Sequence, residues 1–167
     1  MKKKSNLTED KQYNQLAINL SLEAYRKGNA PFGAAIVKND IVLASTPNQT
    51  IAENNLTMHA EMVCIREASK KYGIDGLAGA TMYCSCEPCI MCLFGAYYAR
   101  IKKIVYSAEL EDAIKYGSGD PPISSKWIIK KANLGIEFIQ SDMKEDALKV
   151  FEKYFSKYGP MEKHNTQ

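Results

Sequence analysis

Hydrophobic and polar positions alternate along this chain, first with helical spacing and then with strand-like spacing. Apolar residues recur every three or four positions between Thr8 and Gly28, which predicts an amphipathic helix. Two short apolar runs follow, GAAIV at 33–37 and IVLAS at 41–45. The Lys38-Asn39-Asp40 sequence between them predicts a hairpin turn.

From residue 58 onward, helical and strand-like runs alternate. Strands are predicted at 80–85, 103–108 and 136–140, and helices at 58–72, from Pro88 to about Arg100, at 124–133 and at 142–158. Residues 109–123 contain Gly117, Gly119, Pro121 and Pro122, and they are expected to form a long irregular loop of the kind that is often functional. This order predicts an α/β fold in which helices cover both faces of a five-stranded mixed sheet, giving a three-layer α/β/α sandwich. We expect one domain over residues 1–167, with a flexible tail at 159–167.

Composition narrows the class of protein. A chain of 167 residues with 46% hydrophobic and 25% charged residues is typical of a globular domain that needs no disulfides. Polar residues follow the lysine-rich start, so no signal peptide is expected, and no apolar run of about 18 residues predicts a membrane span. We therefore expect a cytoplasmic protein without a membrane partner, in which clustered cysteines bind metal or react rather than form disulfides.

Four of the five cysteines lie close together, in the sequence CSCEPCIMC at 84–92. Cys89 and Cys92 are three positions apart at the start of a predicted helix, so their side chains share one face and can bind one metal ion. Two thiolates are half of a tetrahedral zinc site. His59, at the start of another predicted helix, can supply a third ligand and leave the fourth position to water. His59-Ala60-Glu61 and PCIMC at 88–92 together match the signature of zinc-dependent deaminases.

Glu61 lies two positions after His59 and is the expected acid–base group. Zinc lowers the pKa of its bound water to about 7, and a carboxylate beside that water can move its proton to a substrate. The two helix starts, near Ala60 and Cys89, also bring free backbone N–H groups and partial positive charge to the same place.

Other uses of the cysteines remain open at this point. One is a structural zinc held by Cys84, Cys86, Cys89 and Cys92, which would leave His59 and Glu61 without a role. Another is a redox pair of Cys89 and Cys92. We expect Cys64 to be a core residue, and Cys84 and Cys86 to pack near the site without binding the metal.

The chain resembles the cytidine-deaminase-like superfamily over about residues 10–155. Within it, the segments PFGAAIVKND at 31–40, MHAE at 58–61 and YCSCEPCIMC at 83–92 are most similar to the guanine deaminase branch. The tRNA adenosine deaminases typically have Asp-Pro-Thr before their His-Ala-Glu sequence, whereas this chain has Leu56-Thr57-Met58.

The resemblance implies hydrolytic deamination of guanine to xanthine and ammonia by a zinc-dependent homodimer. It further implies that Asn48 hydrogen-bonds the purine edge, that Phe32 walls the base and that Asp112 is a second catalytic carboxylate. A backbone N–H near Ala60 would position groups in the pocket, and Tyr158 could close the pocket from the C-terminal segment.

The chain also departs from these relatives. Phe94 stands where they usually have glycine, Met58 replaces a common alanine, and the 109–123 segment differs in length and composition. The alternatives to guanine are guanosine, cytosine, an s-triazine and the adenosine of a tRNA. A net charge of only +3 and a C-terminal helix of mixed charge favour a small purine base over nucleic acid as the partner. Glu61 argues against a non-catalytic zinc protein, because a structural site has no use for that carboxylate.

Overall fold

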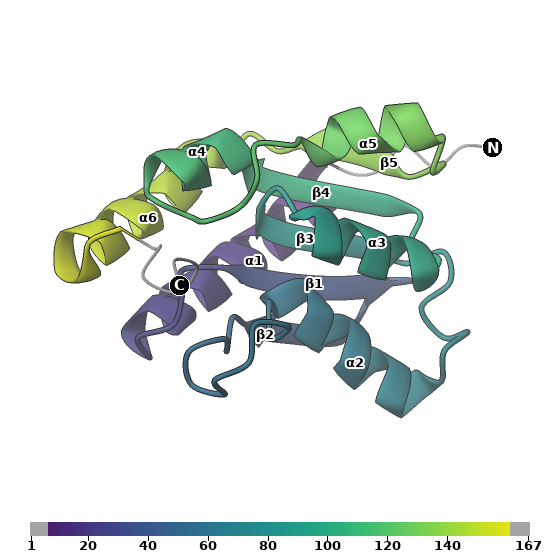
Figure 1. Cartoon of the computed structure of the whole chain (residues 1–167). Coiled ribbons are helices and arrows are strands. Elements are labelled where there is room, and N and C mark those ends of the chain that lie inside the picture. Colours follow the sequence, from purple (N-terminus) through teal and green to yellow (C-terminus); the bar gives the residue numbers. More distant parts are fainter. Residues whose placement is uncertain (1–6, 161–167) are drawn as a thin grey trace.

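A computed structural model describes residues 7–160, which form a mixed sheet between two layers of helices (Figure 1). The strands are β1 Gly33–Lys38, β2 Ile41–Pro47, β3 Thr81–Cys86, β4 Lys103–Ala108 and β5 Glu137–Gln140. The helices are α1 Leu7–Arg26, α2 Ala60–Tyr72, α3 Ile90–Tyr98, α4 Leu110–Lys115, α5 Ser125–Ala132 and α6 Lys144–Tyr158. The expected three-layer α/β/α class is confirmed.

The sheet has the strand order β2-β1-β3-β4-β5. β1 pairs antiparallel with β2 and β3, whereas β3–β4 and β4–β5 are parallel pairs. The carboxyl ends of β3 and β4 therefore meet at one edge, where Cys86 pairs with Ala108. The cysteine motif that follows β3 and the segment that follows β4 start side by side at this edge.

The predicted hairpin turn between β1 and β2 is confirmed. Asn39 and Asp40 have φ values of 50° and 63°, which are left-handed conformations that Asn and Asp tolerate better than most residues.

Different hydrophobic clusters fill the two sides of the sheet. On one side, α2 and α3 pack through fully buried residues such as Cys64 and Leu93 against Ile104 of β4. On the other side, α1 and α6 pack through Ile18 and Phe151. Cys64 is a core residue as expected, and its thiol donates a hydrogen bond to Ala34 O at 3.2 Å.

The prediction for residues 109–123 was wrong in part, because α4 occupies residues 110–115. Glu109 precedes this helix, and its backbone N–H donates to Asp112 Oδ2 at 3.0 Å, so a side chain caps the first turn. The irregular segment is consequently shorter than expected and runs from Tyr116 to Ser124.

Two further predictions concern the C-terminal tail and membrane spans. Most of the predicted flexible tail, residues 161–167, lies outside the described residues. Within residues 7–160, no helix is both long enough and apolar enough to cross a membrane.

Candidate functional site

Three potential metal ligands meet where α2 and α3 begin. His59 Nδ1 lies 3.7 Å from Cys89 Sγ and 3.6 Å from Cys92 Sγ, and the two sulfur atoms are 3.7 Å apart. Within the described residues, this is the one group of three or more such side chains that could hold a metal ion. Cys84 and Cys86 are buried outside this group, so a four-cysteine zinc site is not what the structure forms.

The spacing of these three atoms fits zinc. Zn–S bonds of about 2.3 Å and Zn–N bonds of about 2.0–2.1 Å in a tetrahedron place neighbouring ligand atoms roughly 3.5–3.8 Å apart. The hydrogen bond between Cys89 and Cys92 lowers the pKa of Cys89 to about 4, against the opposing effect of burial, so one thiolate forms readily. One nitrogen and two sulfur ligands leave the fourth position to a non-protein ligand, as in catalytic rather than structural sites.

Close packing of α2 on α3 brings the ligands together. His59 is the residue before α2, Cys89 is the residue before α3, and Cys92 lies in the first turn of α3. A Cβ at Gly95 would lie 2.7 Å from Met62 Sδ of α2, so glycine allows this contact between the two helices without a shift of the Met62 side chain. The ligand set therefore depends on contacts between helices that are distant in sequence.

Glu61 lies in the first turn of α2 and is 7% exposed. Burial raises its pKa to about 7, while the neighbouring His59 acts in the opposite direction. A carboxyl group with a pKa near neutrality can both accept and return a proton at physiological pH.

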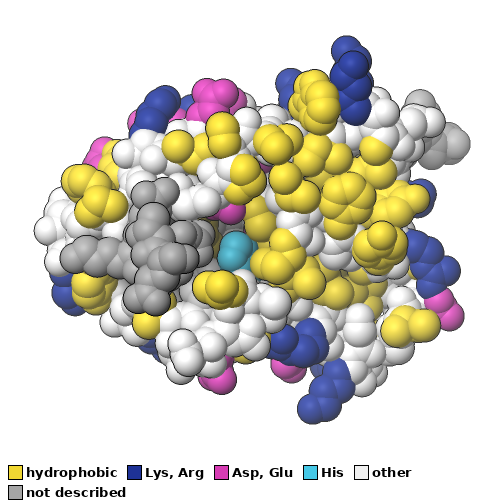
Figure 2. Space-filling model, in the orientation of Figure 1, with side chains coloured by type: hydrophobic (Ala, Val, Ile, Leu, Met, Phe, Trp, Pro, Cys, Tyr) yellow, Lys and Arg dark blue, Asp and Glu magenta, His cyan; other side chains and the backbone are white. Residues whose placement is uncertain are grey.

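A cavity of about 390 Å³ opens beside His59. Its lining includes Ala30, Phe32, Asn48, Ser118, Gly119 and Asp120. Residues between Thr50 and Leu56 complete the wall. In Figure 2 the histidine of the described residues is visible at the surface, with a field of hydrophobic side chains beside it. The volume is within the range of small-molecule sites.

Two of the predicted substrate residues line this cavity. Asn48 is 2% exposed, and its Oδ1 accepts hydrogen bonds from Thr50 N at 3.0 Å and Thr50 Oγ1 at 2.8 Å. Both hydrogen bonds use Oδ1, so the NH2 group of Asn48 remains available as a donor. Phe32 lies in the lining and makes a T-shaped contact with Phe151, with ring centroids 5.5 Å apart, which restrains the orientation of its ring.

Asp112 lies elsewhere. Its carboxylate is 2.8 Å from Lys144 Nζ and accepts the Glu109 N–H, and Asp112 does not belong to the described residues that line the cavity. The acidic residue in the lining is Asp120. Burial raises the pKa of Asp120, and the negative charge of Cys89 adds to this effect, which agrees with a position beside the metal ligands.

Sequence reasoning missed Asp120. The signal was its position in the Gly- and Pro-rich stretch GSGDPP at 117–122, since an acidic residue in such a loop is a better candidate for a site than one in a helix with charged neighbours.

The remaining predicted residues take different positions. Ala60 is fully buried and is the first residue of α2, so its backbone N–H belongs to the helix start beside the ligands. Tyr158 packs against Tyr25 and Tyr154, with ring centroids 6.0 Å and 5.0 Å away, and it is not among the described residues that line the cavity. The expected pocket-closing role of Tyr158 stays a prediction.

Comparison with known proteins agrees with this site. Residues 7–108 match the family described as the cytidine and deoxycytidylate deaminase zinc-binding region. The chain belongs to this family of zinc-binding deaminases, and the zinc expected from the His59, Cys89 and Cys92 set is the metal of that domain.

Curated relatives of two kinds are similar to the chain. It is 42% identical over 105 residues to a guanine deaminase of Bacillus subtilis (strain 168), an alignment that covers 62% of this chain and 67% of the relative. It is 38% identical over 102 residues to a tRNA-specific adenosine deaminase of the same organism, covering 61% of this chain and 63% of the relative. Sequence similarity alone leaves the substrate unresolved between them.

Solved structures share the fold. The structure of a guanine deaminase from Nitrosomonas europaea superposes with a TM-score of 0.77 at 20% identity, covering 86% of this chain and 83% of that one. A tRNA:A34 deaminase superposes with a TM-score of 0.72 at 24% identity, covering 84% and 99%. At these identities the likeness shows the fold alone.

Proposed function

We propose that the protein deaminates a free purine base, with guanine as the substrate and xanthine and ammonia as the products. The observation that carries the proposal is the cavity beside His59, in which an aromatic wall, an amide donor and a carboxylate converge from Phe32, Asn48 and Asp120. A purine presents a flat face to an aromatic wall and both acceptor and donor atoms at its edge.

The roles of the side chains follow from their positions. Asn48 donates from its NH2 group to an acceptor on the purine edge. Asp120 accepts from an N–H of the base or from its exocyclic amine, which is why guanine suits an acidic residue here. Because burial leaves these groups few other partners, an analogue that lacks the matching atom would bind much more weakly.

Proton transfer is assigned to Glu61. His59, Cys89 and Cys92 would hold a zinc ion, which would supply a water molecule that loses its proton near neutral pH. The Glu61 carboxylate accepts that proton and delivers it to a ring nitrogen next to the carbon that carries the amine. Glu61 then passes the second proton of the water to the departing amine, so that one water and one guanine give one xanthine and one ammonia.

A second candidate is deamination of an adenosine in tRNA, because several curated relatives are tRNA-specific adenosine deaminases. Helix α5 supports it with exposed Lys126, Lys130 and Lys131 around Trp127, whose side chain is 58% exposed. Basic and aromatic side chains together are the usual contacts for single-stranded RNA.

The test compares both candidates in one panel. Purified zinc-loaded protein is incubated with guanine, guanosine, cytosine, adenine and an anticodon stem-loop RNA, and ammonia release or inosine formation is measured. We expect ammonia from guanine alone, and none from the Glu61→Ala variant. Reaction with the RNA and not with guanine would overturn the proposal, and the salt dependence of that reaction would then locate the basic contacts.

We also propose that the protein is a homodimer that uses the aromatic cluster of α3, defined as Phe94, Tyr97 and Tyr98. These rings contact one another with centroids 5.6–6.5 Å apart, yet Tyr97 and Tyr98 are 41% and 77% exposed. Figure 2 shows hydrophobic side chains gathered on this face. Exposed aromatic clusters are typical of interfaces, and the resemblance to the deaminase superfamily supports a second copy as the partner. Sedimentation of the wild type and of Tyr98→Asp tests it, with a dimer expected for the first and a weaker dimer for the second.

A further inference from the structure

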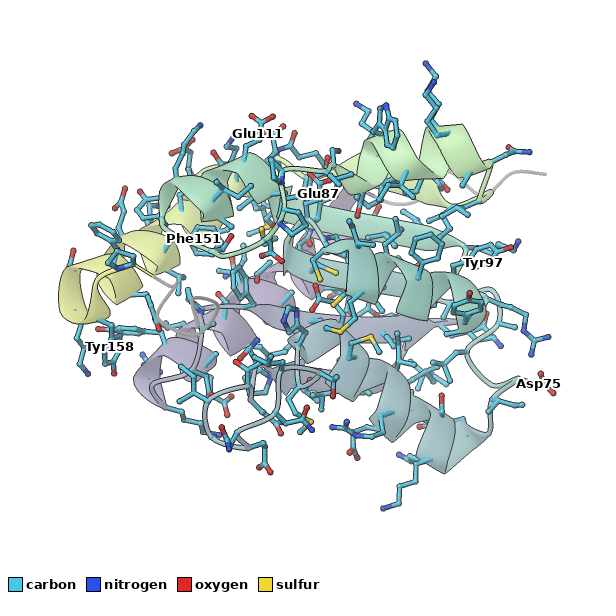
Figure 3. The ribbon with its side chains drawn as sticks, in the orientation of Figure 1. Asp75, Glu87, Tyr97, Glu111, Phe151 and Tyr158 are labelled. Atoms are coloured by element: carbon cyan, nitrogen blue, oxygen red, sulfur yellow. The ribbon has the colours of Figure 1, made fainter. Side chains whose placement is uncertain are left out.

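Glu87 is a buried carboxylate that the proposed chemistry does not use. It follows β3 directly, lies two positions before Cys89 and is 7% exposed. Figure 3 labels Glu87 near the end of the parallel strands, close to the segment that joins α4 to α5, and shows Glu111 of α4 further out. No Lys or Arg within residues 7–160 forms an ion pair with Glu87.

Hydrogen-bond donors take the place of a counter-ion. Oε1 of Glu87 accepts from Ser124 Oγ at 2.9 Å and from Ser125 N at 2.7 Å, and Oε2 accepts from Leu110 N at 3.4 Å. Oε1 therefore contacts the first residue of α5, and Oε2 contacts the first residue of α4. Hydrogen bonds to an ionised acceptor are roughly twice as strong as neutral ones.

The backbone around Glu87 reinforces the same connection. Glu87 N donates to Ala108 O at 2.8 Å, and Ser125 Oγ donates to Pro88 O at 2.6 Å. The metal-binding motif is therefore attached to the end of β4 and to the start of α5, which are the two ends of one continuous segment.

That segment carries the cavity residues that lie between the two attachments. Ser118, Gly119 and Asp120 belong to the irregular stretch from Tyr116 to Ser124. This stretch contributes no strand to the sheet, so its position over the cavity depends on the contacts at its ends, together with the packing of Tyr116 against Phe151 and Phe155.

We propose that Glu87 is a positioning residue that fixes both ends of the 110–125 segment to the zinc-binding motif and so places Asp120 over the substrate. The role of Asp120 in this statement rests on the proposed function. The attachment itself does not, because it can be measured without substrate.

A carboxylate is needed because three donors converge on its two oxygens. The Glu87→Gln substitution keeps the shape but supplies one acceptor oxygen, and its NH2 group then faces a donor. One end of the segment is left without its partner, and an unpaired buried group weakens the attachment. Glu111→Gln is the matched control, since Glu111 is an exposed glutamate on the same segment.

The experiment measures hydrogen exchange of the 116–124 amides, zinc content and steady-state kinetics. For Glu87→Gln we expect full zinc occupancy, exchange in 116–124 at least about tenfold faster, and kcat/KM about 10–100-fold lower, the usual effect of losing a group that orients a site. Glu111→Gln is expected to match the wild type. Asp120→Asn should also lower kcat/KM by a smaller factor in the Glu87→Gln background than in the wild type, because the Asp120 carboxylate is already misplaced there.

Several results would overturn the proposal. If the 116–124 amides of Glu87→Gln exchange at the same rate as those of Glu111→Gln, Glu87 does not hold this segment in place. Zinc loss in proportion to activity would make Glu87 a support for the metal instead. If Asp120→Asn lowers kcat/KM by the same factor in the wild type and in Glu87→Gln, Glu87 does not act through Asp120.

Two provisions keep the outcome clear. If Glu87→Gln does not fold, Ser124→Ala removes one of the same hydrogen bonds and Ser124→Thr retains it, so this pair is measured in its place. If the wild type deaminates another member of the substrate panel, the kinetics are run with that substrate, and the proposed substrate fails without deciding the role of Glu87.

Discussion

His59 Nδ1 lies 3.6 Å from Cys92 Sγ, although 33 positions separate these residues in the sequence. The contact joins the start of α2 to the first turn of α3, so a metal bound there also links the two helices. Metal binding and stability should consequently be coupled, because a ligand that binds only the folded state stabilises it.

The first prediction concerns this coupling. Cys92→Ser replaces a fully buried thiol with a weaker ligand, so the variant should bind much less than one zinc per chain, lose activity and melt at a lower temperature. A chelator should lower the melting temperature of the wild type but not that of the variant. Metal analysis and thermal unfolding measure both. Cys64→Ser is the control, because a hydroxyl can replace the hydrogen bond to Ala34 O, and zinc loss in that variant would contradict the ligand assignment.

The second prediction concerns Glu61. Glu61→Gln keeps the size of the side chain and removes its ability to accept a proton, so kcat should fall by about 10²–10⁴-fold at unchanged zinc content. Stability should not fall, because burial raises the pKa of Glu61 to about 7 and therefore disfavours the charged form that the substitution removes. Kinetics and denaturant unfolding of the same preparation give both quantities. Unchanged activity in Glu61→Gln would contradict the acid–base role of Glu61 and leave zinc binding as the one supported property of the site.

The third prediction separates the two aspartates. Asp120→Asn removes the charge that faces the cavity, so kcat/KM should fall by about 100-fold while the unfolding free energy stays the same. Asp112→Asn removes the ion pair with Lys144 and should instead lower the unfolding free energy by about 1–3 kcal/mol with a smaller effect on kcat/KM. The reverse pattern would restore Asp112 as the catalytic carboxylate.

The metal site could be predicted from sequence because its ligands follow local rules. Cys89 and Cys92 share a helix face by their spacing alone, and His59 lies at a helix start that the hydrophobic pattern indicates. The five strands could be predicted for the same reason, since their apolar runs and the Asn39-Asp40 turn are local signals.

The substrate side was less predictable because nonlocal contacts determine it. Asp120 faces the cavity through a segment with no regular pattern, whose ends are attached to Glu87 from 23 and 37 positions away. The local sequence around Asp112 indicates a different role, because Glu109 and Asp112 have the spacing of a capped helix start. A resemblance carried over by position does not distinguish two aspartates eight residues apart when the loop between them varies.

The last prediction concerns how the cavity distinguishes donors from acceptors. Asn48→Asp retains the Oδ1 that accepts from Thr50 N and Thr50 Oγ1, so the turn at 48–50 should persist. It replaces the NH2 donor with a second acceptor, so an acceptor on the purine edge would face a carboxylate. The KM for guanine should rise by about 10–100-fold, equivalent to about 1.4–2.7 kcal/mol, with little change in zinc content.

Asn48→Ala provides the comparison for Asn48→Asp, because it removes both the donor and the turn contacts. It should raise KM and also lower the melting temperature, whereas Asn48→Asp should raise KM alone. Steady-state kinetics with thermal unfolding distinguishes these patterns. If both variants bind guanine as the wild type does, Asn48 serves only the turn, and the purine edge must be recognised by other residues of the cavity such as Asp120.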